Sequence, residues 1–323
     1  MIHSAATPCE TQLRIEIHGQ ILSPCPIFQR HSILSQQGSK NPNCMKLKFY
    51  GTRGSIPTCD AGFQGFGGNT TCLQLRFPDT NRIAIIDAGT GIRNLGKDLL
   101  AIGHKQENLL IVFTHFHWDH IQGLPFFGPA YIPGQNITIL TIGKDHTVSS
   151  LREVFEVQMQ TEYFPVQLDH MGADFEFLAI DQASEHLTGI NGIQTKLSAV
   201  RQNHPGGAYG LRIERHGKVL VICTDVEHEE TIDPQLIELA RGADLLVHDA
   251  QFTADELTTH RGWGHSSYDQ AMQFAELAGV KRLVFTHHDP DHDDEFLLRM
   301  EKLCQTRFPN SLLAREGMEL DIE

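Results

Sequence analysis

The sequence predicts an α+β protein in which two β-sheets pack face to face and the helices lie outside them. Strand-like segments dominate the chain from Met45 onward, and helices alternate with short strands after residue 224. This order of elements is typical of layered sheets with helices on their outer faces. A chain of 323 residues, 40% of them hydrophobic, has enough apolar material for one large domain or two small ones. No repeat with a period of 20 to 50 residues is visible, so a solenoid or propeller is not expected.

Most of the strands are predicted from alternating or continuous apolar runs that end at turn residues. The turn His216-Gly217 joins two of them into a predicted hairpin. The predicted strands cover residues 46–50, 71–77, 83–86, 109–113, 175–180, 193–200, 208–214, 218–223, 245–247 and 283–286.

Two helices are predicted from the residues at their ends. The segments 234–241 and 268–278 each begin after a capping residue and stop at a glycine. The signals are Asp233, Pro234 and Gly242 for the first helix, and Ser267, Gln270 and Gly279 for the second. Residues 151–159 are also compatible with a helix, within a segment, 145–174, that is either a wall beside the functional site or a connector.

The first 44 residues differ from the rest of the chain. They hold three of the seven cysteines, are rich in Ser, Gln and Pro, and show no sustained periodicity. We therefore expect residues 1–44 to be a disordered or non-domain extension and residues 45–323 to form the domain. Met45 is also a candidate translation start, and the sequence does not separate an over-extended reading frame from a natural tail.

Charge and composition restrict the partners. The formal net charge of −14, without a Lys/Arg cluster in the sequence, disfavours a long nucleic acid and leaves a small anionic substrate. An odd number of cysteines without a Cys-x-x-Cys pair predicts free thiols in a reducing compartment. No apolar run reaches 18 residues and no signal peptide is visible, so we expect a cytoplasmic protein without a membrane partner. A homodimer is compatible with the sequence, which does not fix the oligomeric state.

The most informative segment is THFHWDH at residues 114–120. It follows the predicted buried strand 109–113 and contributes His115, His117, Asp119 and His120. A strand that ends in three imidazoles and a carboxylate is a poor core element but a good metal site. Neutral imidazole and carboxylate suit zinc, and less selectively manganese or iron.

Further residues of the same chemical kind follow other predicted strands. They are His204, Asp225, Asp249 with its neighbour His248, and His287. A single polar residue after a strand is ordinary, whereas a set of this size indicates that the strand ends converge on one site.

The order H-x-H-x-D-H followed by His, Asp and His resembles the metallo-β-lactamase superfamily of binuclear metallohydrolases, over roughly residues 45–300. The resemblance implies a four-layer αββα sandwich of two mixed sheets and two divalent metal ions, zinc being expected and manganese or iron being alternatives. It also implies that Asp119 orients the nucleophile. The implied ligands are His115, His117 and His204 for the first metal, Asp119, His120 and His287 for the second, and Asp225 as the bridging carboxylate. His288 is an alternative to His287, which is favoured because it directly follows a strand and Thr286.

A second resemblance concerns His265 and Asp249. The segments H-D-A-Q-F (248–252) and G-H-S-S (264–267) are similar to the phosphodiesterase branch of the superfamily, which includes RNase Z and cyclic phosphodiesterases. In that branch a carboxylate orients a histidine that donates a proton to the leaving group. The resemblance therefore implies that His265 is the acid and Asp249 its partner, although Asp249 is one methylene shorter than the family's Glu. A helix-capping role for His265 remains the structural alternative.

Weaker signals stay open. Arg53, in the Gly-rich turn 51–54, is either a phosphate contact or the partner of a carboxylate, and Asp87 resembles a residue that is usually structural. An apolar group after the metal motif either stacks a base or belongs to the core; it comprises Trp118, Phe126, Phe127 and Tyr131. The absence of a G-x-S-x-G motif makes a serine hydrolase an unfavourable hypothesis.

The leading hypothesis is a binuclear metal-dependent phosphodiesterase that hydrolyses a small phosphodiester, such as a cyclic nucleotide, by attack of a metal-bridged hydroxide. The alternatives are a tRNA 3′-processing endonuclease, a lactone or thioester hydrolase, and a metal-binding sensor without turnover. The sequence fixes neither the substrate nor the physiological metal.

Overall fold

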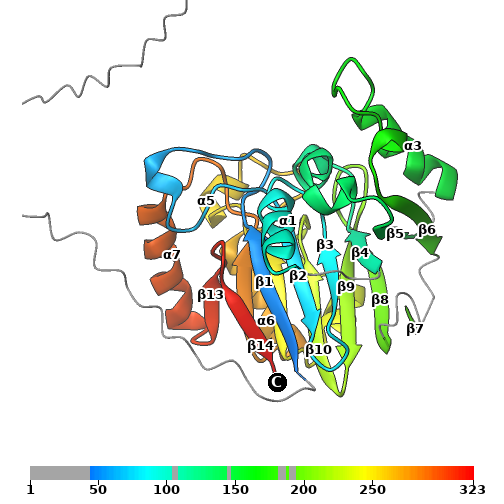
Figure 1. The fold of residues 1–323 in the computed structure, drawn as a ribbon. Coiled ribbons are helices and arrows are strands. Elements are labelled where there is room, and N and C mark those ends of the chain that lie inside the picture. The colour runs from blue at the N-terminus through cyan, green and yellow to red at the C-terminus, as the bar shows by residue number, and fades with distance from the viewer. Residues whose placement is uncertain (1–43, 104–107, 144–146, 181–186, 189–193) are drawn as a thin grey trace, which may run out of the picture. The chain divides into compact units, whose positions relative to one another are not determined.

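The structure is a computed structural model that describes residues 44–103, 108–143, 147–180, 187–188 and 194–323 (Figure 1). The predictions made for the N-terminal extension fall on residues 1–43, which lie outside the described residues. The proposed domain boundary at Met45 therefore stays a prediction. Within the described residues, the sulfur atoms of Cys59, Cys72, Cys223 and Cys304 form no disulfide.

The strands form two mixed sheets. In the first sheet, neighbouring strands pair antiparallel from β14 through β1 and β2 to β3, and parallel from β3 through β4 and β5 to β6. Its order is β14 (Glu319–Ile322), β1 (Met45–Gly51), β2 (Cys72–Phe77), β3 (Arg82–Ile86), β4 (Asn108–Phe113), β5 (Asn136–Ile142) and β6 (Asp174–Ile180).

The second sheet has the same mixture. Its pairing is parallel from β13 to β10 and antiparallel from β10 to β7. Its order is β13 (Ser311–Leu313), β12 (Leu283–Thr286), β11 (Leu245–Asp249), β10 (Lys218–Cys223), β9 (Ala208–Arg215), β8 (Gln194–Gln202) and β7 (Leu187–Thr188).

Three apolar clusters hold the layers together. The central cluster lies between the sheets and includes Leu47 and Val112 from the first and Leu211 and Val247 from the second. The other two clusters lie between each sheet and its helices. Helices α1 (Ile92–Ala101) and α3 (Val148–Gln158) cover the first sheet, and α4 (Pro234–Ala240), α6 (Tyr268–Ala278) and α7 (Asp294–Arg307) cover the second (Figure 1). The predicted four-layer αββα sandwich is confirmed.

The residues predicted to cap the ends of α4 and α6 do so in the structure. The Asp233 carboxylate accepts a hydrogen bond from the Gln235 N–H at 2.8 Å and caps α4. The Ser267 hydroxyl and the Gln270 side chain form the capping box of α6. Gly279 ends α6 in the left-handed region with φ of 65°, which costs glycine little.

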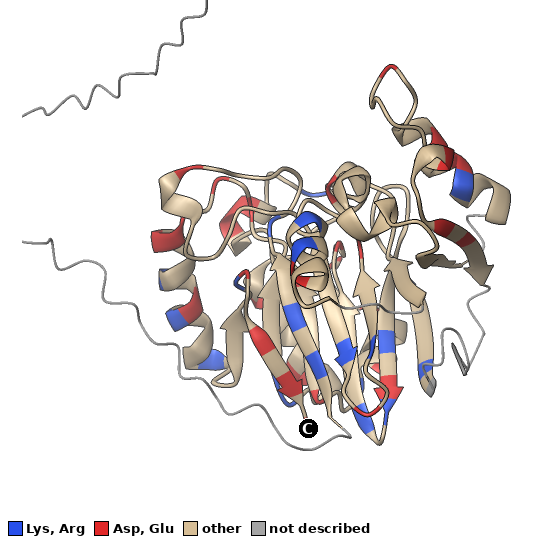
Figure 2. Cartoon of the chain, viewed as in Figure 1, with Lys and Arg blue, Asp and Glu red and all other residues tan. Residues whose placement is uncertain are grey.

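Sheet pairing brings together cations that are dispersed in the sequence. Lys46 on β1 lies opposite Arg76 on β2, and Lys48 lies two residues further along β1; Figure 2 shows basic bands on these strands. Lys46 pairs with Asp321 at 2.5 Å and Lys48 with Asp98 at 3.0 Å. This basic strip is therefore largely matched by carboxylates. Within the described residues, no helix combines the length and apolarity that crossing a bilayer requires.

Candidate metal centre and acid–base pair

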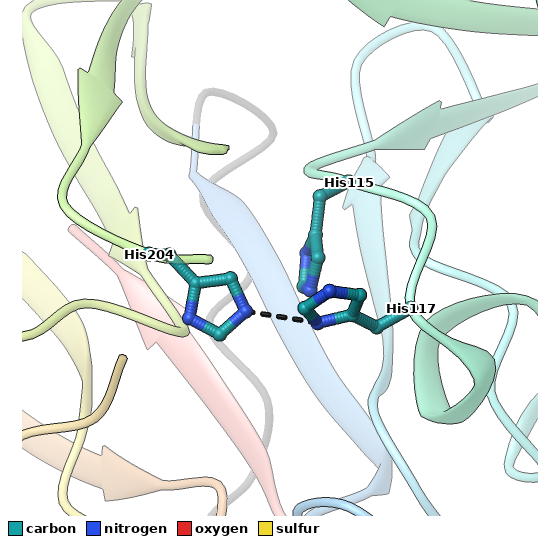
Figure 3. Close-up of side chains that lie close together, drawn as sticks. All are labelled: His115, His117 and His204. Atoms are coloured by element: carbon teal, nitrogen blue, oxygen red, sulfur yellow. Dashed lines mark hydrogen bonds between the residues drawn. The ribbon is translucent and has the colours of Figure 1, made fainter. Parts of the chain in front are cut away.

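Three histidines, two after a strand of the first sheet and one after a strand of the second, form a cluster (Figure 3). His115 follows β4, His117 precedes the short helix α2 (Trp118–Ile121), and His204 follows β8. His117 Nδ1 lies 2.9 Å from His204 Nε2, and the His115 ring centroid lies 4.6 Å from that of His117. One nitrogen from each ring lies within 4.8 Å of the other two. Three neutral imidazoles at this spacing are a suitable set of ligands for zinc.

A second cluster of four buried residues adjoins the first. Asp119 and His120 come from α2, Asp225 follows β10, and His287 follows β12. His287 Nε2 lies 3.1 Å from Asp119 Oδ2 and 3.1 Å from Asp225 Oδ1. His120 Nε2 lies 3.1 Å from Asp225 Oδ2. Two carboxylates and two imidazoles thus converge on one point.

Asp225 faces both clusters. Besides its contacts in the second cluster, its Oδ1 lies 3.7 Å from His115 Nε2 and 3.9 Å from His204 Nε2. Burial raises the pKa of Asp225, but the positive field of His120 and His287 holds that pKa well below its usual range. Asp225 is therefore an ionised carboxylate placed where it can bridge two cations.

Four of the histidines direct Nε2 into the clusters, and a hydrogen-bond contact at Nδ1 orients each of these rings. Such outer contacts fix the tautomer of a metal-binding histidine. The Nδ1 contacts are His115 to Thr114 Oγ1 at 3.1 Å, His120 to Asp87 Oδ2 at 2.8 Å, His204 to the Gly264 carbonyl at 2.9 Å and His287 to Gln251 Oε1 at 3.1 Å.

The donor set fits divalent metal ions. His115 Nε2 is buried and makes no hydrogen bond within the described part of the chain. Burial lowers the pKa of His115 well below its usual range, which favours the neutral imidazole that a metal needs. A buried, unpaired nitrogen costs free energy unless another group binds it, and a metal ion would do so.

Several of these residues sit in strained backbone. Asp87, Asp225 and His287 have φ values of 60°, 57° and 61°, in the left-handed region that non-glycine residues rarely adopt. Asp87 and His287 directly follow β3 and β12, and Asp225 comes two residues after the end of β10. Each of the three points a side chain into the second cluster or onto one of its members. Strain concentrated in this way is typical of functional sites.

Asp249 and His265 form a buried hydrogen-bonded pair beside the clusters. Asp249 Oδ2 accepts from His265 Nδ1 at 2.7 Å and from the Asp225 N–H at 3.1 Å. Asp249 Oδ1 accepts from the N–H groups of Gln251 and Ser266, each at 3.1 Å. The His265 ring stacks on His287 with centroids 4.8 Å apart. Because both oxygens of Asp249 are already committed to donors, the pair is better suited to hold a proton-carrying imidazole than to bind a third metal.

Comparison with known proteins shows the family. The model described as the beta-lactamase superfamily domain matches residues 82–288. The chain belongs to the metallo-β-lactamase superfamily. It is a hydrolase of this superfamily, as the sequence predicted, and the superfamily's fold binds divalent metal ions, typically zinc.

Individual superfamily members resemble the whole domain. Ribonuclease Z of Synechococcus sp. (strain CC9311) is 27% identical, over 86% of this chain and 99% of its own. Ribonuclease BN of Enterobacter sp. (strain 638) is 26% identical, over 85% and 99%. The solved structure of human tRNase Z, short form, is 22% identical with a TM-score of 0.60, over 86% of this chain and 99% of its own. A new diphosphatase from the PhnP family is 21% identical with a TM-score of 0.60, over 86% and 97%. At such identities, the solved structures establish the shared fold alone.

The structure brings together all the residues that the superfamily pattern singled out. It also separates His287 from His288, whose Nε2 lies 2.9 Å from the Ala314 carbonyl and whose ring faces Phe66. His287 lies in the second cluster, so the preference for His287 agrees with the geometry. The roles of these residues as ligands stay predictions.

Two weaker predictions turn out differently. Arg53 is fully buried, and its guanidinium donates to the carbonyls of Gly67, Asp289 and His292. Among the described residues it makes no ion pair with a carboxylate side chain. The apolar group after the metal motif is divided. Phe127 is core at 0% exposure, whereas Trp118 and Phe126 are 65% and 57% exposed.

Sequence reasoning missed two contacts that complete the site. The Ser55 N–H donates to Asp119 Oδ2 at 2.9 Å, and the Gln251 amide contacts His287. Gly54 lies so close to His287 that an added Cβ would be 2.3 Å from its Nδ1. The Gly-rich turn 51–54 was the available signal, but it did not reveal which residue required the close approach.

Replacing Asp87 by alanine is expected to weaken metal binding by about 10–100-fold, because Asp87 orients His120. Asp87 also accepts from the Thr114 N–H and hydroxyl, each at 2.8 Å. Leaving such buried donors unpaired should cost about 1–3 kcal/mol each in the free energy of unfolding. Zinc competition titration and urea unfolding would measure the two effects. Asp98→Ala, which removes an exposed partner of Lys48, is the control, and unchanged zinc affinity in Asp87→Ala would contradict the orienting role.

Proposed function

We propose that the protein is a binuclear metal-dependent phosphodiesterase that hydrolyses a small phosphodiester, with a cyclic nucleotide as a candidate. The observation that carries the proposal is the buried Asp249–His265 pair beside the two ligand clusters. A hydrolase that expels an alkoxide needs an acid for the leaving oxygen. His265 bonds to Asp249 and stacks on His287, and this position beside the second cluster supports its role as that acid.

His115, His117 and His204 would hold one metal ion, Asp119, His120 and His287 would hold the other, and Asp225 would bridge them. Zinc is the expected metal, with manganese and iron as alternatives. When bound, two divalent ions lower the pKa of a water nucleophile and stabilise charge on the attacking and leaving oxygens.

The residues of the chain have separate tasks in this scheme. The carboxylate of Asp119 is held by the Ser55 N–H and would accept a hydrogen bond from the attacking water, thereby orienting it. Burial raises the pKa of Asp119, but the nearby His120 lowers it below its usual range, so this carboxylate stays ionised. As the P–O bond to the leaving group breaks, His265 would donate its Nε2 proton to the leaving oxygen, while Asp249 holds Nδ1.

The charge of the protein favours a small substrate. A net charge of −14 opposes a polyanion at long range, and the basic strip on β1 and β2 is largely neutralised by Asp98, Glu319 and Asp321. A compact phosphodiester has little charge outside the metal centre. We therefore favour it over a long nucleic acid.

The discriminating experiment compares bond types. We expect metal-loaded protein to hydrolyse bis-p-nitrophenyl phosphate or a 3′,5′-cyclic nucleotide with a higher kcat/KM than p-nitrophenyl acetate, a lactone or a thioester. A higher kcat/KM for the lactone or thioester would replace the proposal with the corresponding hydrolase.

A second candidate, tRNA 3′ processing, is favoured by the names of the curated relatives, which are Ribonuclease Z and Ribonuclease BN. It would use the same metal centre and the same acid. Cleavage of a precursor tRNA at its 3′ side, together with tight binding that weakens steeply with salt, would favour this candidate over a small substrate.

A further inference from the structure

We propose that Gln251 is a positioning residue that fixes which nitrogen of His287 faces the second metal cluster. Gln251 lies in the loop after β11 and is only 3% exposed. The inference rests on the proposed metal centre but concerns a side chain to which neither the superfamily pattern nor the comparisons give a role.

The contacts of the Gln251 amide define a tautomer. Its Oε1 lies 3.1 Å from His287 Nδ1. A carbonyl oxygen can only accept, so Nδ1 must carry a proton, and the neutral imidazole that a metal ion requires then has its lone pair on Nε2. His287 Nε2 is the atom that lies 3.1 Å from both Asp119 Oδ2 and Asp225 Oδ1. The amide thus directs the lone pair of His287 into the cluster.

A carboxylate prevents the amide from turning over. Gln251 Nε2 donates to Asp289 Oδ2 at 3.1 Å, and an ionised carboxylate only accepts. Rotation of the amide would place its oxygen against Asp289 and its NH₂ group against His287 Nδ1. Both contacts would then be unfavourable, so Asp289 selects the orientation that suits the metal centre.

Arg53 holds the main chain at Asp289 in place. The guanidinium is fully buried and donates to the Asp289 carbonyl at 2.9 Å and to the His292 carbonyl at 2.7 Å. Its Nε donates to the Gly67 carbonyl at 2.8 Å. The chain of contacts therefore runs from Arg53 through Asp289 and Gln251 to His287, which explains why an arginine is buried so close to the site.

Gln251 also touches the acid–base pair. Its backbone N–H donates to Asp249 Oδ1 at 3.1 Å, and Asp249 holds His265. One residue therefore contacts both the partner of the acid and a ligand of the second metal, and its main-chain contact is retained in any side-chain substitution.

The test measures zinc affinity rather than turnover. The purified full-length protein is stripped of metal and then titrated with zinc against a chelating indicator. Gln251→Leu should bind one of its two zinc ions about 10–100-fold less tightly, as expected when an orienting partner is lost. Gln74→Leu is the matched control, because Gln74 is a similarly buried glutamine at 5% exposure on β2. It should leave both zinc affinities unchanged.

A donor–acceptor exchange separates positioning from simple packing. Gln251→Glu alone places two carboxylates side by side and should also weaken the second zinc. Gln251→Glu combined with Asp289→Asn restores a donor facing an acceptor and should recover the affinity to within a few-fold. Nitrogen-15 NMR of the zinc-loaded protein should show His287 protonated at Nδ1 in the wild type and in the double variant.

Unchanged zinc affinity in folded Gln251→Leu, or failure of the double variant to recover, would overturn the inference. Zinc affinity does not depend on the substrate. The positioning role of Gln251 and the proposed phosphodiesterase activity can therefore be disproved independently of each other. A protein that hydrolyses no phosphodiester but loses its second zinc in Gln251→Leu would retain the positioning role and lose the proposed activity.

Discussion

Replacement of His265 by alanine is expected to lower kcat for a phosphodiester by about 10²–10⁴-fold, the usual contribution of a general acid. His265 contacts Asp249 and stacks on His287, but it is not one of the predicted ligands. Both metal ions should therefore remain bound. Steady-state kinetics together with metal analysis of the same sample would measure both outcomes.

Comparing substrates with different leaving groups makes this test more specific for an acid. An acid matters little when the leaving group is a stable anion such as p-nitrophenolate and matters most when it is an alkoxide. The loss in His265→Ala should therefore be larger for a 3′,5′-cyclic nucleotide than for bis-p-nitrophenyl phosphate. His216→Ala, in the β9–β10 turn, is the control histidine. Equal losses on both substrates would argue that His265 is only structural.

Replacement of Asp225 by alanine should impair metal binding as well as turnover, because Asp225 faces both clusters. We expect at least one metal ion to be lost. Metal ions supply several kcal/mol of transition-state stabilisation, and each 1.36 kcal/mol is tenfold in rate, so kcat should fall by about 10³-fold or more. Metal content by elemental analysis and turnover at saturating zinc would check this expectation.

Asp244 provides the matched control. It is a buried carboxylate that accepts from the Val219 N–H at 2.7 Å and pairs with Lys281 at 2.7 Å. Asp244→Ala should reduce the free energy of unfolding while retaining both metals. If Asp225→Ala also kept two metals and its turnover, Asp225 would not be the bridging ligand.

The strands and the metal-binding residue types that follow them were predictable, because both are visible in short stretches of sequence. Buried strands such as 109–113 are continuous apolar runs, and His115 and His117 come within four residues of the end of this one. The convergence of His204, Asp225 and His287 on that segment required the superfamily pattern. Periodicity alone does not say which strands share a sheet. The pairing of β10, β11 and β12 brings Asp225 and His287 to one edge, and β9 places β8 with His204 at the same edge.

The contacts between side chains and loops were not predictable. Gln251, Ser55 and Asp289 are ordinary polar residues in the sequence, and their roles arise because three separate loops meet at His287. Arg53 was expected to meet an anion, but the fold places backbone carbonyls around its guanidinium. The adjacent histidines 287 and 288 are chemically identical, and only the direction of each side chain separates them.

Turnover of a 3′,5′-cyclic nucleotide or bis-p-nitrophenyl phosphate as a function of added metal tests the central claim most directly. Starting from chelated, inactive protein, the account predicts that hydrolysis rises with zinc and saturates at two equivalents per chain. Absence of hydrolysis at every loading of zinc, manganese and iron would contradict it.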